Sequence, residues 1–345
     1  MNSMNSMSHR IPAYQLTADN RPLDALINSR ILDLSVTDNR SGEADELSLS
    51  LSDHDGLLEL PRRGVLLTCK LGFTDTGLVD MGRFVVDETE FAGTPDIITI
   101  KARSADFRSS IKSGQRQSYH RQTLGQIATT IAQRNKLKLV ITPALSGLPL
   151  EHVDQTDESD LNLLTRLARA NGAELAIKQG SLLIFKAGQA RSASGQPLPP
   201  VTLTRQDGDQ FRYSEADRNS DYTGVSAYYQ DTGKASRQRV TAGSPEVRGA
   251  GDDPNAKTRV LKQTFASEAE ARRAAEAAMN ETSRQQATFS INTGYGRPDI
   301  GSESPVRLQG FKPQIDRLNW IVAKAIHRYS RSNGLTSAID LEASL

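Results

Sequence analysis

The feature that most constrains the fold is a series of short stretches, between residues 11 and 110, in which apolar and polar side chains alternate. In the clearest of them, at 47–51, leucines alternate with Ser48 and Ser50. Because successive side chains of a strand point to opposite faces, this stretch has one apolar and one polar face. Several short strands with turn signals between them predict an antiparallel barrel or sandwich. The other stretches lie at 31–36, 65–73, 82–91 and 97–103.

The region from about 116 to 190 changes character and predicts a small α+β middle domain. Thr123 and Gln126 have the spacing of a capping box, and apolar residues at helical spacing follow them. Asn135 can end this helix, and a strand is expected at 137–141. The apolar residues of the expected helix are Leu124, Ile127, Ala128, Ile131 and Ala132.

The stretch at 153–185 predicts a capped helix followed by a β-hairpin. Thr156 or Asp157 is expected as the N-cap, because either side-chain oxygen can accept a backbone N–H of the first turn. Gly172 is expected to end the helix, since glycine tolerates the left-handed conformation of a C-cap. The hairpin strands are expected at 174–178 and 182–185. Charges that suit the helix dipole are Asp157, Glu158 and Asp160 near the start and Arg166 and Arg169 near the end.

The remainder of the chain again favours β structure. A linker rich in Gly, Ser and Pro at 187–200 precedes the strand candidates, and the polar stretch at 231–257 is expected to be a mobile loop. Ser267 and Glu270 form another capping box, which begins an alanine-rich helix suited to lying on a sheet. Asn333 and Gly334 predict the turn into a last strand. The strand candidates are 201–204, 211–215, 222–230, 260–265, 287–293, 304–308, 319–329 and 336–341.

The stretch around the expected helix carries one set of polar and apolar residues at fixed spacing: Glu158, Ser159, Asp160, Leu164, Arg166, Leu167, Ala168 and Gly172. The pattern is similar to a helix of the late control protein D family, whose members are baseplate hub proteins of contractile-tailed phages and phage-like particles. A similar helix occurs in the hub portion of type VI secretion spike proteins. The order of later landmarks, through Trp320 and His327, is also similar, so the resemblance runs from about Ile11 to the C-terminus. We interpret the motif as structural, serving capping and packing.

The resemblance implies a mainly β fold with an α+β insert, in which two tail-tube-like antiparallel β-barrels flank the middle domain. The expected boundaries place a disordered N-terminus at 1–10 and the first barrel at 11–115. The middle domain is expected at 116–190. The second barrel is expected at 191–345, with an embedded helix at about 267–283.

The composition excludes several classes of function. The chain has 345 residues, with 42 Lys and Arg against 41 Asp and Glu, and this balance argues against a dedicated nucleic-acid binder. Its single cysteine, Cys69, cannot form an intrachain disulfide or a thiolate cluster and is expected to be a buried strand residue. The N-terminus lacks the apolar segment of a signal peptide, and no stretch is long and apolar enough to span a membrane. Synthesis in the bacterial cytoplasm is therefore expected.

Motifs that carry chemistry are absent from the sequence. The five histidines have no metal-ligand spacing, and His152 with Asp154 is interpreted as a plain surface pair. No GxSxG or Walker pattern occurs, and the GxG at 294–296 lacks the strand–turn–helix context of a dinucleotide loop. The carboxylates at 87–90 and 157–160 are explained by solvated strand faces and helix capping. We therefore expect a protein that is not an enzyme, with no catalytic, cofactor-binding or metal-binding residue.

By resemblance, the expected function is that of a structural hub in the baseplate of a virion or phage-like particle. A homotrimer would present six barrels and adapt a six-fold tail tube to a three-fold spike. The expected partners are further copies of the chain, a central spike protein, a tail-tube or tube-initiator protein and other baseplate proteins, with no membrane. Two alternatives are a peptidoglycan hydrolase, which needs a carboxylate pair across a cleft, and a tail component that contacts DNA.

Overall fold

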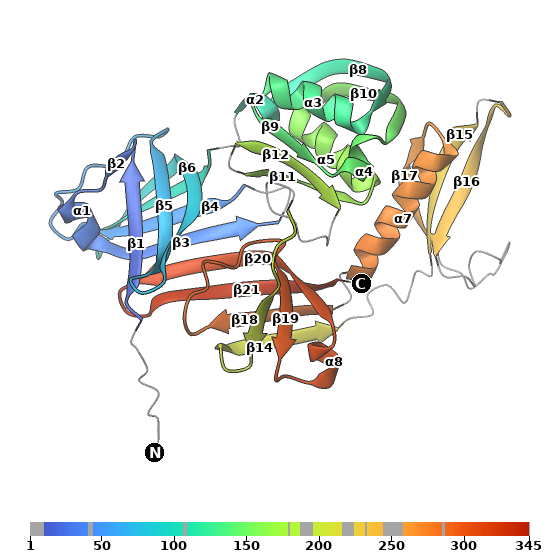
Figure 1. Ribbon diagram of the computed structural model, residues 1–345. Coiled ribbons are helices and arrows are strands. Elements are labelled where there is room, and N and C mark those ends of the chain that lie inside the picture. Colours follow the sequence, from blue (N-terminus) through green and yellow to red (C-terminus); the bar gives the residue numbers. More distant parts are fainter. Residues whose placement is uncertain are drawn as a thin grey trace.

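The computed structural model describes residues 10–40, 44–105, 109–178, 180–186, 196–215, 224–231, 233–243, 258–284 and 287–344. The fold is mainly β, and its buried apolar side chains gather in separate cores. Figure 1 shows the parts in chain order, with the N-terminal strands in blue, the middle domain in green and the C-terminal strands in red. The expected disordered segment at 1–10 lies, apart from Arg10, outside the described residues.

The first β unit confirms the alternation of the N-terminal sequence. Leucines of the alternating stretches, such as Leu34 and Leu47, fill its core, while the serines between them are only partly buried. Cys69 is buried in the same core, as expected. The elements are β1 (Pro12–Ala18), β2 (Arg21–Pro22), α1 (Ala25–Arg30), β3 (Ile31–Asn39), β4 (Glu46–Ser52), β5 (Leu66–Phe73), β6 (Gly77–Ala92) and β7 (Ile97–Ser104).

The second β unit surrounds Trp320. The indole ring of Trp320 packs 5.9 Å from the ring of Phe289, and its Nε1 donates a hydrogen bond of 3.0 Å to the carbonyl of Ile315. The predicted turn is confirmed, because Gly334 has φ +70° and opens the last strand. The elements are β13 (Val201–Thr204), β14 (Gly208–Glu215), β18 (Ala287–Thr293), β19 (Pro305–Gln309), α8 (Pro313–Asp316), β20 (Asn319–Ser330) and β21 (Gly334–Ser344).

The two β units share one sheet, which the sequence did not predict. Strand β3 pairs antiparallel with β20, so the order runs β14-β18-β21-β20-β3-β4-β7-β6-β5-β1-β2, with β13 and β19 joined beside β20. Figure 1 shows β3 directly above β20. The two units have separate apolar cores. In the first unit, β1 pairs with β5 and β2 and not with β3, so the strand pairs among its described residues do not form a closed ring. Closure of each unit into a barrel stays a prediction.

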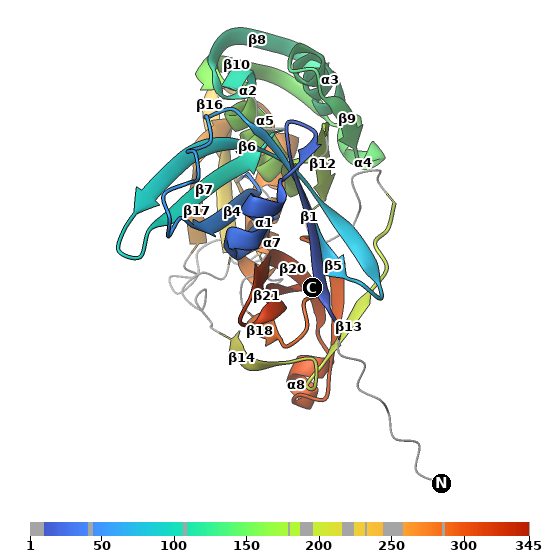
Figure 2. The same ribbon diagram turned by 90° about the vertical axis from the view of Figure 1, so that its left-hand side faces the viewer.

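The middle domain packs its two longest helices, of 11 residues each, against two small sheets. Strands β8 and β10 form a two-stranded ribbon, and β11, β12 and β9 form a three-stranded sheet; Figure 2 shows both at the top of the molecule. The capping box of Thr123 and Gln126 is confirmed. The elements are α2 (Ser109–Lys112), β8 (Gly114–Thr123), α3 (Leu124–Arg134), β9 (Lys138–Ile141), α4 (Pro143–Ser146), β10 (Pro149–Ser159), α5 (Asp160–Ala170), β11 (Ala173–Lys178) and β12 (Ser181–Lys186).

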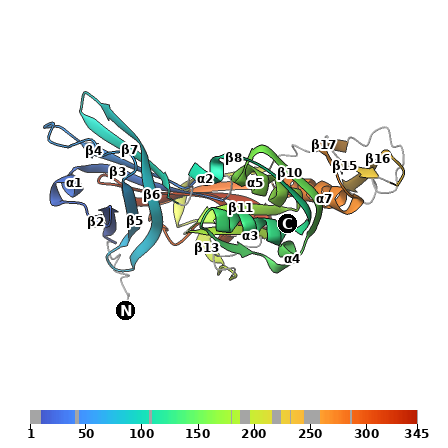
Figure 3. The same cartoon turned by 90° about the horizontal axis from the view of Figure 1, so that it is seen from above.

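A further layer lies inside the region expected to be the second barrel. Helix α7 (Glu268–Arg284) confirms the alanine-rich helix and packs on a separate sheet of β15 (Gly224–Asp231), β16 (Ser236–Gly243) and β17 (Thr258–Phe265). Figure 3 shows this layer at the end opposite the first β unit. Strand β16 corrects the expected loop at 231–257, of which 232 and 244–257 lie outside the described residues. None of the described helices has the length and apolar content that crossing a membrane requires.

Candidate functional site

Ser159 begins the motif helix, which corrects the expected N-cap. The side chain of Ser159 accepts a hydrogen bond of 3.2 Å from the backbone N–H of Asn162. Thr156 and Asp157 instead belong to β10, because pairing with β8 continues through a bulge to Ser159. The carboxylate of Asp157 forms an exposed ion pair with Arg116 of β8. Strand pairing, which is not local in sequence, therefore sets where the helix begins.

Asp160 is fully buried, so its role is larger than the helix-dipole charge that the sequence suggested. Its carboxylate accepts hydrogen bonds from Asn135 Nδ2 at 2.8 Å, Gln155 Nε2 at 2.9 Å and Arg134 NH1 at 3.1 Å. Asn135 and Arg134 end α3, and Gln155 lies on β10. A buried carboxylate needs such donors to offset its lost hydration. Asp160 thus fixes α5 to α3 and β10 at one point.

Arg166 also differs from its expected role at the C-terminal end of the helix. Its guanidinium contacts Glu158, with NH2 2.8 Å from Oε2, and NH2 also donates to the carbonyl of Asp154 at 3.2 Å. Arg166 therefore connects α5 to β10, the strand that precedes it. Leu164, Leu167 and Ala168 are buried on the core side of the helix.

Gly172 follows Asn171, the C-cap of α5, with φ +66°, as expected. A Cβ at Gly172 would lie 3.5 Å from the Cβ of Ala277, so the end of α5 faces α7. The structure thus brings all eight motif residues onto α5 and its two ends. Their contacts cap, pack and seat the helix, which supports a structural role, and that role stays a prediction.

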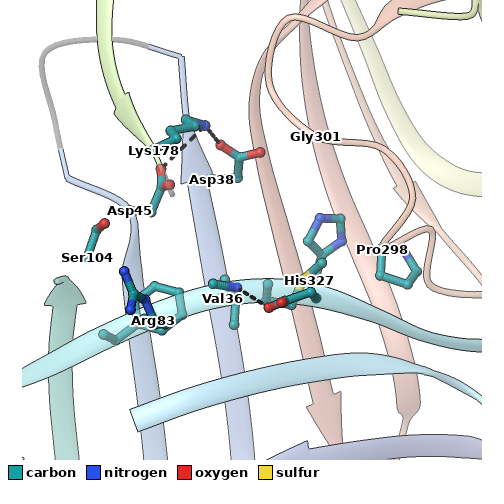
Figure 4. A pocket seen from close by; sticks show the side chains of 13 residues that line it. Val36, Asp38, Asp45, Arg83, Ser104, Lys178, Pro298, Gly301 and His327 are labelled. Carbon is teal, nitrogen blue, oxygen red and sulfur yellow. Dashed lines mark hydrogen bonds and ion pairs between the residues drawn. The ribbon is translucent and has the colours of Figure 1, made fainter. Parts of the chain in front are cut away.

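A polar junction joins the two β units to the middle domain (Figure 4). Lys178, at the end of β11, pairs its Nζ with Asp38 of β3, lies 2.8 Å from Ser302 Oγ and is 3.7 Å from Asp45 Oδ1. The backbone N–H of Ser302 donates to Asp38 Oδ2 at 2.8 Å. Asp38 and Asp45 belong to the first unit and Ser302 to the second. One lysine therefore connects three parts of the chain.

The charges at this junction are set by burial and by one another. Burial acts to raise the pKa of Asp38, but the charge and hydrogen bond of Lys178 outweigh it and leave that pKa below its ordinary value. Burial raises the pKa of Asp45 to about 6, since Lys178 offsets it only in part. Burial acts to lower the pKa of Lys178, and the two carboxylates reverse this, so it is raised. Lys178 and Asp38 are therefore charged near neutral pH, and Asp45 can exchange a proton.

The junction borders a cavity of about 400 Å³ between the β units. His327 of β20 lines it, and its Nδ1 lies 2.7 Å from Ser337 Oγ. Burial lowers the pKa of His327 and favours its neutral form. Lys178, Asp38 and Asp45 were not predicted to share a site, because the lysine and Asp38 lie 140 residues apart. The local signal was a charged side chain that directly follows the apolar run at 175–177 at the end of a strand.

The outward face of the shared sheet is polar over four strands. Ser35, Ser48, Lys101 and Glu88 lie opposite one another in a row across β3, β4, β7 and β6. Lys101 Nζ contacts Glu88 Oε1 at 3.0 Å, and Arg328 of β20 contacts Asp33 at 2.9 Å. Charges on this face are thus paired between neighbouring strands, so they leave little net field.

Exposed apolar side chains gather at the two ends of the long strand β6. The end group lies near the β6–β7 turn, and contacts such as Asp53 N to Asp96 O hold its loop and turn together. The start group lies near the β5–β6 turn, where Thr74 N donates to Ile11 O and Tyr295 packs 6.4 Å from Phe73. The end group is Leu57, Leu60 and Phe91, and the start group is Ile11, Leu78, Val79 and Tyr295.

The sequence matches the family described as phage tail baseplate hub (GPD) over residues 75–333. The chain is 41% identical to a probable baseplate hub protein of Escherichia phage 186, with 97% of this chain and 93% of that protein covered.

Solved structures extend this likeness at the level of the fold. A 43 kDa tail protein of prophage MuSo2 from Shewanella oneidensis aligns with a TM-score of 0.69 at 15% identity, covering 95% of this chain and 97% of that chain. An E. coli component of the type VI secretion system aligns with a TM-score of 0.60 at 12% identity, covering 96% and 77%. The resemblance drawn from the motif at 158–172 is confirmed. The chain belongs to the phage tail baseplate hub (GPD) family.

Proposed function

We propose that this chain is the central hub of a contractile-tail baseplate and acts as a homotrimer between a six-fold tail tube and a three-fold spike. The observation that carries the proposal is the family relationship over nearly the whole chain. The fold supports it, because each copy holds two β units with separate cores joined edge to edge in one sheet. Three copies would then offer six β units to a six-fold tube.

The polar face of the shared sheet supports a wet lumen. Its serines and paired charges expose little apolar surface to bind what passes along it, and opposite charges held side by side give no strong attraction for DNA. Neither the hydrolase nor the DNA-contact alternative gains a specific observation among the described residues. A central spike protein, a tail-tube or tube-initiator protein and other baseplate proteins remain the proposed partners in the virion.

The two exposed apolar groups support contacts between copies. Leu78 of the start group and Phe91 of the end group lie 13 residues apart on β6, so the distance between them is up to about 40 Å in an extended strand. Groups at opposite ends of one unit suit a heterologous interface, in which the end group of one copy meets the start group of the next. Such contacts form a ring when the rotation between copies closes.

The decisive experiment is to determine the mass of the purified chain in solution by light scattering, alone and mixed with its spike protein, and to image assembled particles. We expect three copies, arranged around the tail axis between tube and spike. A chain that stays monomeric with the spike present, or that lies away from the axis of the particle, would refute the proposal.

A further inference from the structure

Two exposed histidines face each other on the ribbon of β8 and β10. His120 and His152 are direct partners in the antiparallel register, and both side chains are accessible to solvent. Their Nδ1 atoms are 2.9 Å apart, and the rings lie at a centroid distance of 4.5 Å with 29° between their planes. The sequence separates them by 32 residues, so the pair did not show as a spacing motif.

A second layer of contacts fixes the state of one imidazole. His152 Nε2 lies 2.8 Å from Asp154 Oδ2, and Ser118 Oγ donates to the other oxygen, Oδ1, at 2.6 Å. Because a carboxylate only accepts, His152 Nε2 donates to Asp154, and in the neutral imidazole this leaves the Nδ1 lone pair directed toward His120. A carboxylate that orients a histidine in this way is the usual outer partner of a metal-bound imidazole.

We propose that His120 and His152 form a binding site for a divalent transition-metal ion, with Cu²⁺ and Ni²⁺ preferred over Zn²⁺. An ion about 2.0–2.1 Å from both nitrogens with its bonds at a right angle would place those nitrogens about 2.9 Å apart, whereas a tetrahedral ion would need about 3.3–3.4 Å. The observed 2.9 Å fits the right-angled geometry of square-planar and octahedral ions. The metal takes the place of the proton shared between the two Nδ1 atoms.

The two imidazoles would be the protein ligands of the ion, and water molecules would fill its other coordination positions. Within the described residues, no group of three or more His, Cys, Asp or Glu side chains can hold a metal ion. The ion therefore binds more weakly than at a closed structural site and stays open to exchange. It cross-links β8 to β10, the strand that leads directly into α5. Metal binding would therefore stiffen the β8–β10 ribbon next to the motif helix. The proposed metal site does not depend on the proposed hub role.

The test is titration of the untagged full-length protein with Cu²⁺, followed by calorimetry and electron paramagnetic resonance. We expect one ion with two nitrogen ligands, and at least a tenfold loss of affinity in both His120→Ala and His152→Ala. Asp154→Asn should weaken binding by about 10–100-fold, the usual effect of losing an outer partner. His54→Ala is the matched control, because His54 is an exposed histidine of the first β unit, and it should bind as the parent does.

Folding is checked by comparing the melting temperatures of all variants without metal, and His120→Gln and His152→Gln replace any alanine variant that melts early. The proposal is overturned if the double variant His120→Ala/His152→Ala binds Cu²⁺ as tightly as the parent. It is also overturned if His54→Ala loses as much affinity, since binding would then not be specific to the ribbon.

Discussion

Asp160 is the residue whose loss should weaken the middle domain most. Its buried carboxylate is the acceptor for Asn135 Nδ2, Gln155 Nε2 and Arg134 NH1. Asp160→Ala would remove one acceptor from each amide, although Asn135 Nδ2 still donates to the carbonyl of Ile131 and Gln155 Nε2 to that of Glu158. A hydrogen bond to a charged group contributes about 1.5–3 kcal/mol, and an unsatisfied buried donor costs about 1–3 kcal/mol. These losses overlap, so we expect a net destabilisation of about 3–5 kcal/mol.

Amide hydrogen exchange of α5 measures this effect locally, which matters in a chain with several cores. A loss of about 3 kcal/mol corresponds to exchange roughly 100-fold faster, if α5 opens with the domain. Asp160→Asn keeps the shape but presents an amide to other donors, so it should fall between the parent and the alanine variant. The matched control is Asp157→Ala, three residues away in an exposed ion pair with Arg116. Equal exchange rates in Asp160→Ala and Asp157→Ala would refute the reasoning.

Two predictions concern the polar junction, with the fluorescence of Trp320, the single tryptophan, as the probe of unfolding. Lys178→Met should lower the free energy of unfolding by an amount near the lower end of the ~3–5 kcal/mol for breaking a buried ion pair, since the lysine is 23% exposed. The control is Lys101→Met, which removes an exposed ion pair and should leave the urea unfolding curve unchanged. Asp45 has a raised pKa of about 6 against an ordinary 3.8, so the folded state binds its proton more tightly. Its contribution, ~1–3 kcal/mol, is therefore present below pH 4 and is lost as the pH rises to about 6. Asp45→Asn should remove this slope, and identical pH profiles for variant and parent would contradict the assignment.

Local chemistry was predictable from the sequence. The capping box at Thr123, the helix stop at Gly172 and the turn at Gly334 depend on residues close together in the sequence, and each lies where the sequence placed it. The start of α5 was wrong because the pairing of β10 with β8 extends the strand through Thr156. Strand β16 was missed because Val240 and Ala242 are its only apolar residues, and pairing with β15 stabilises it.

The candidate site was less accessible to sequence reasoning than the fold. The motif residues were identified, but the partners of Asp160 come from α3 and β10, and no spacing along the chain reveals them. The same holds for Lys178 with Asp38 and for His120 opposite His152. These contacts depend on the register of strands and on how separate units meet, which are properties of the folded chain as a whole.

The edges of the shared sheet indicate how copies of the chain can meet. β2 has only two residues, and β14 carries a register shift beside Gln210, whose φ is +50°. Short or irregular edges resist pairing with another chain. Contacts between copies would then rest on the exposed apolar groups rather than on added strands.

Phe91→Ser and Tyr295→Ser, one from each group, should therefore both lower the fraction of the proposed trimer. Partial burial of one large apolar side chain contributes about 1–3 kcal/mol, a factor of roughly 5–150 in association at each interface. Val260→Ser is the matched control, because Val260 is 48% exposed, comparable to the 54% of Phe91, but lies on β17 outside both groups. Light scattering over a concentration series makes the comparison. If Phe91→Ser and Val260→Ser dissociate alike, the apolar groups do not form the interface, and strand pairing between copies becomes the better explanation.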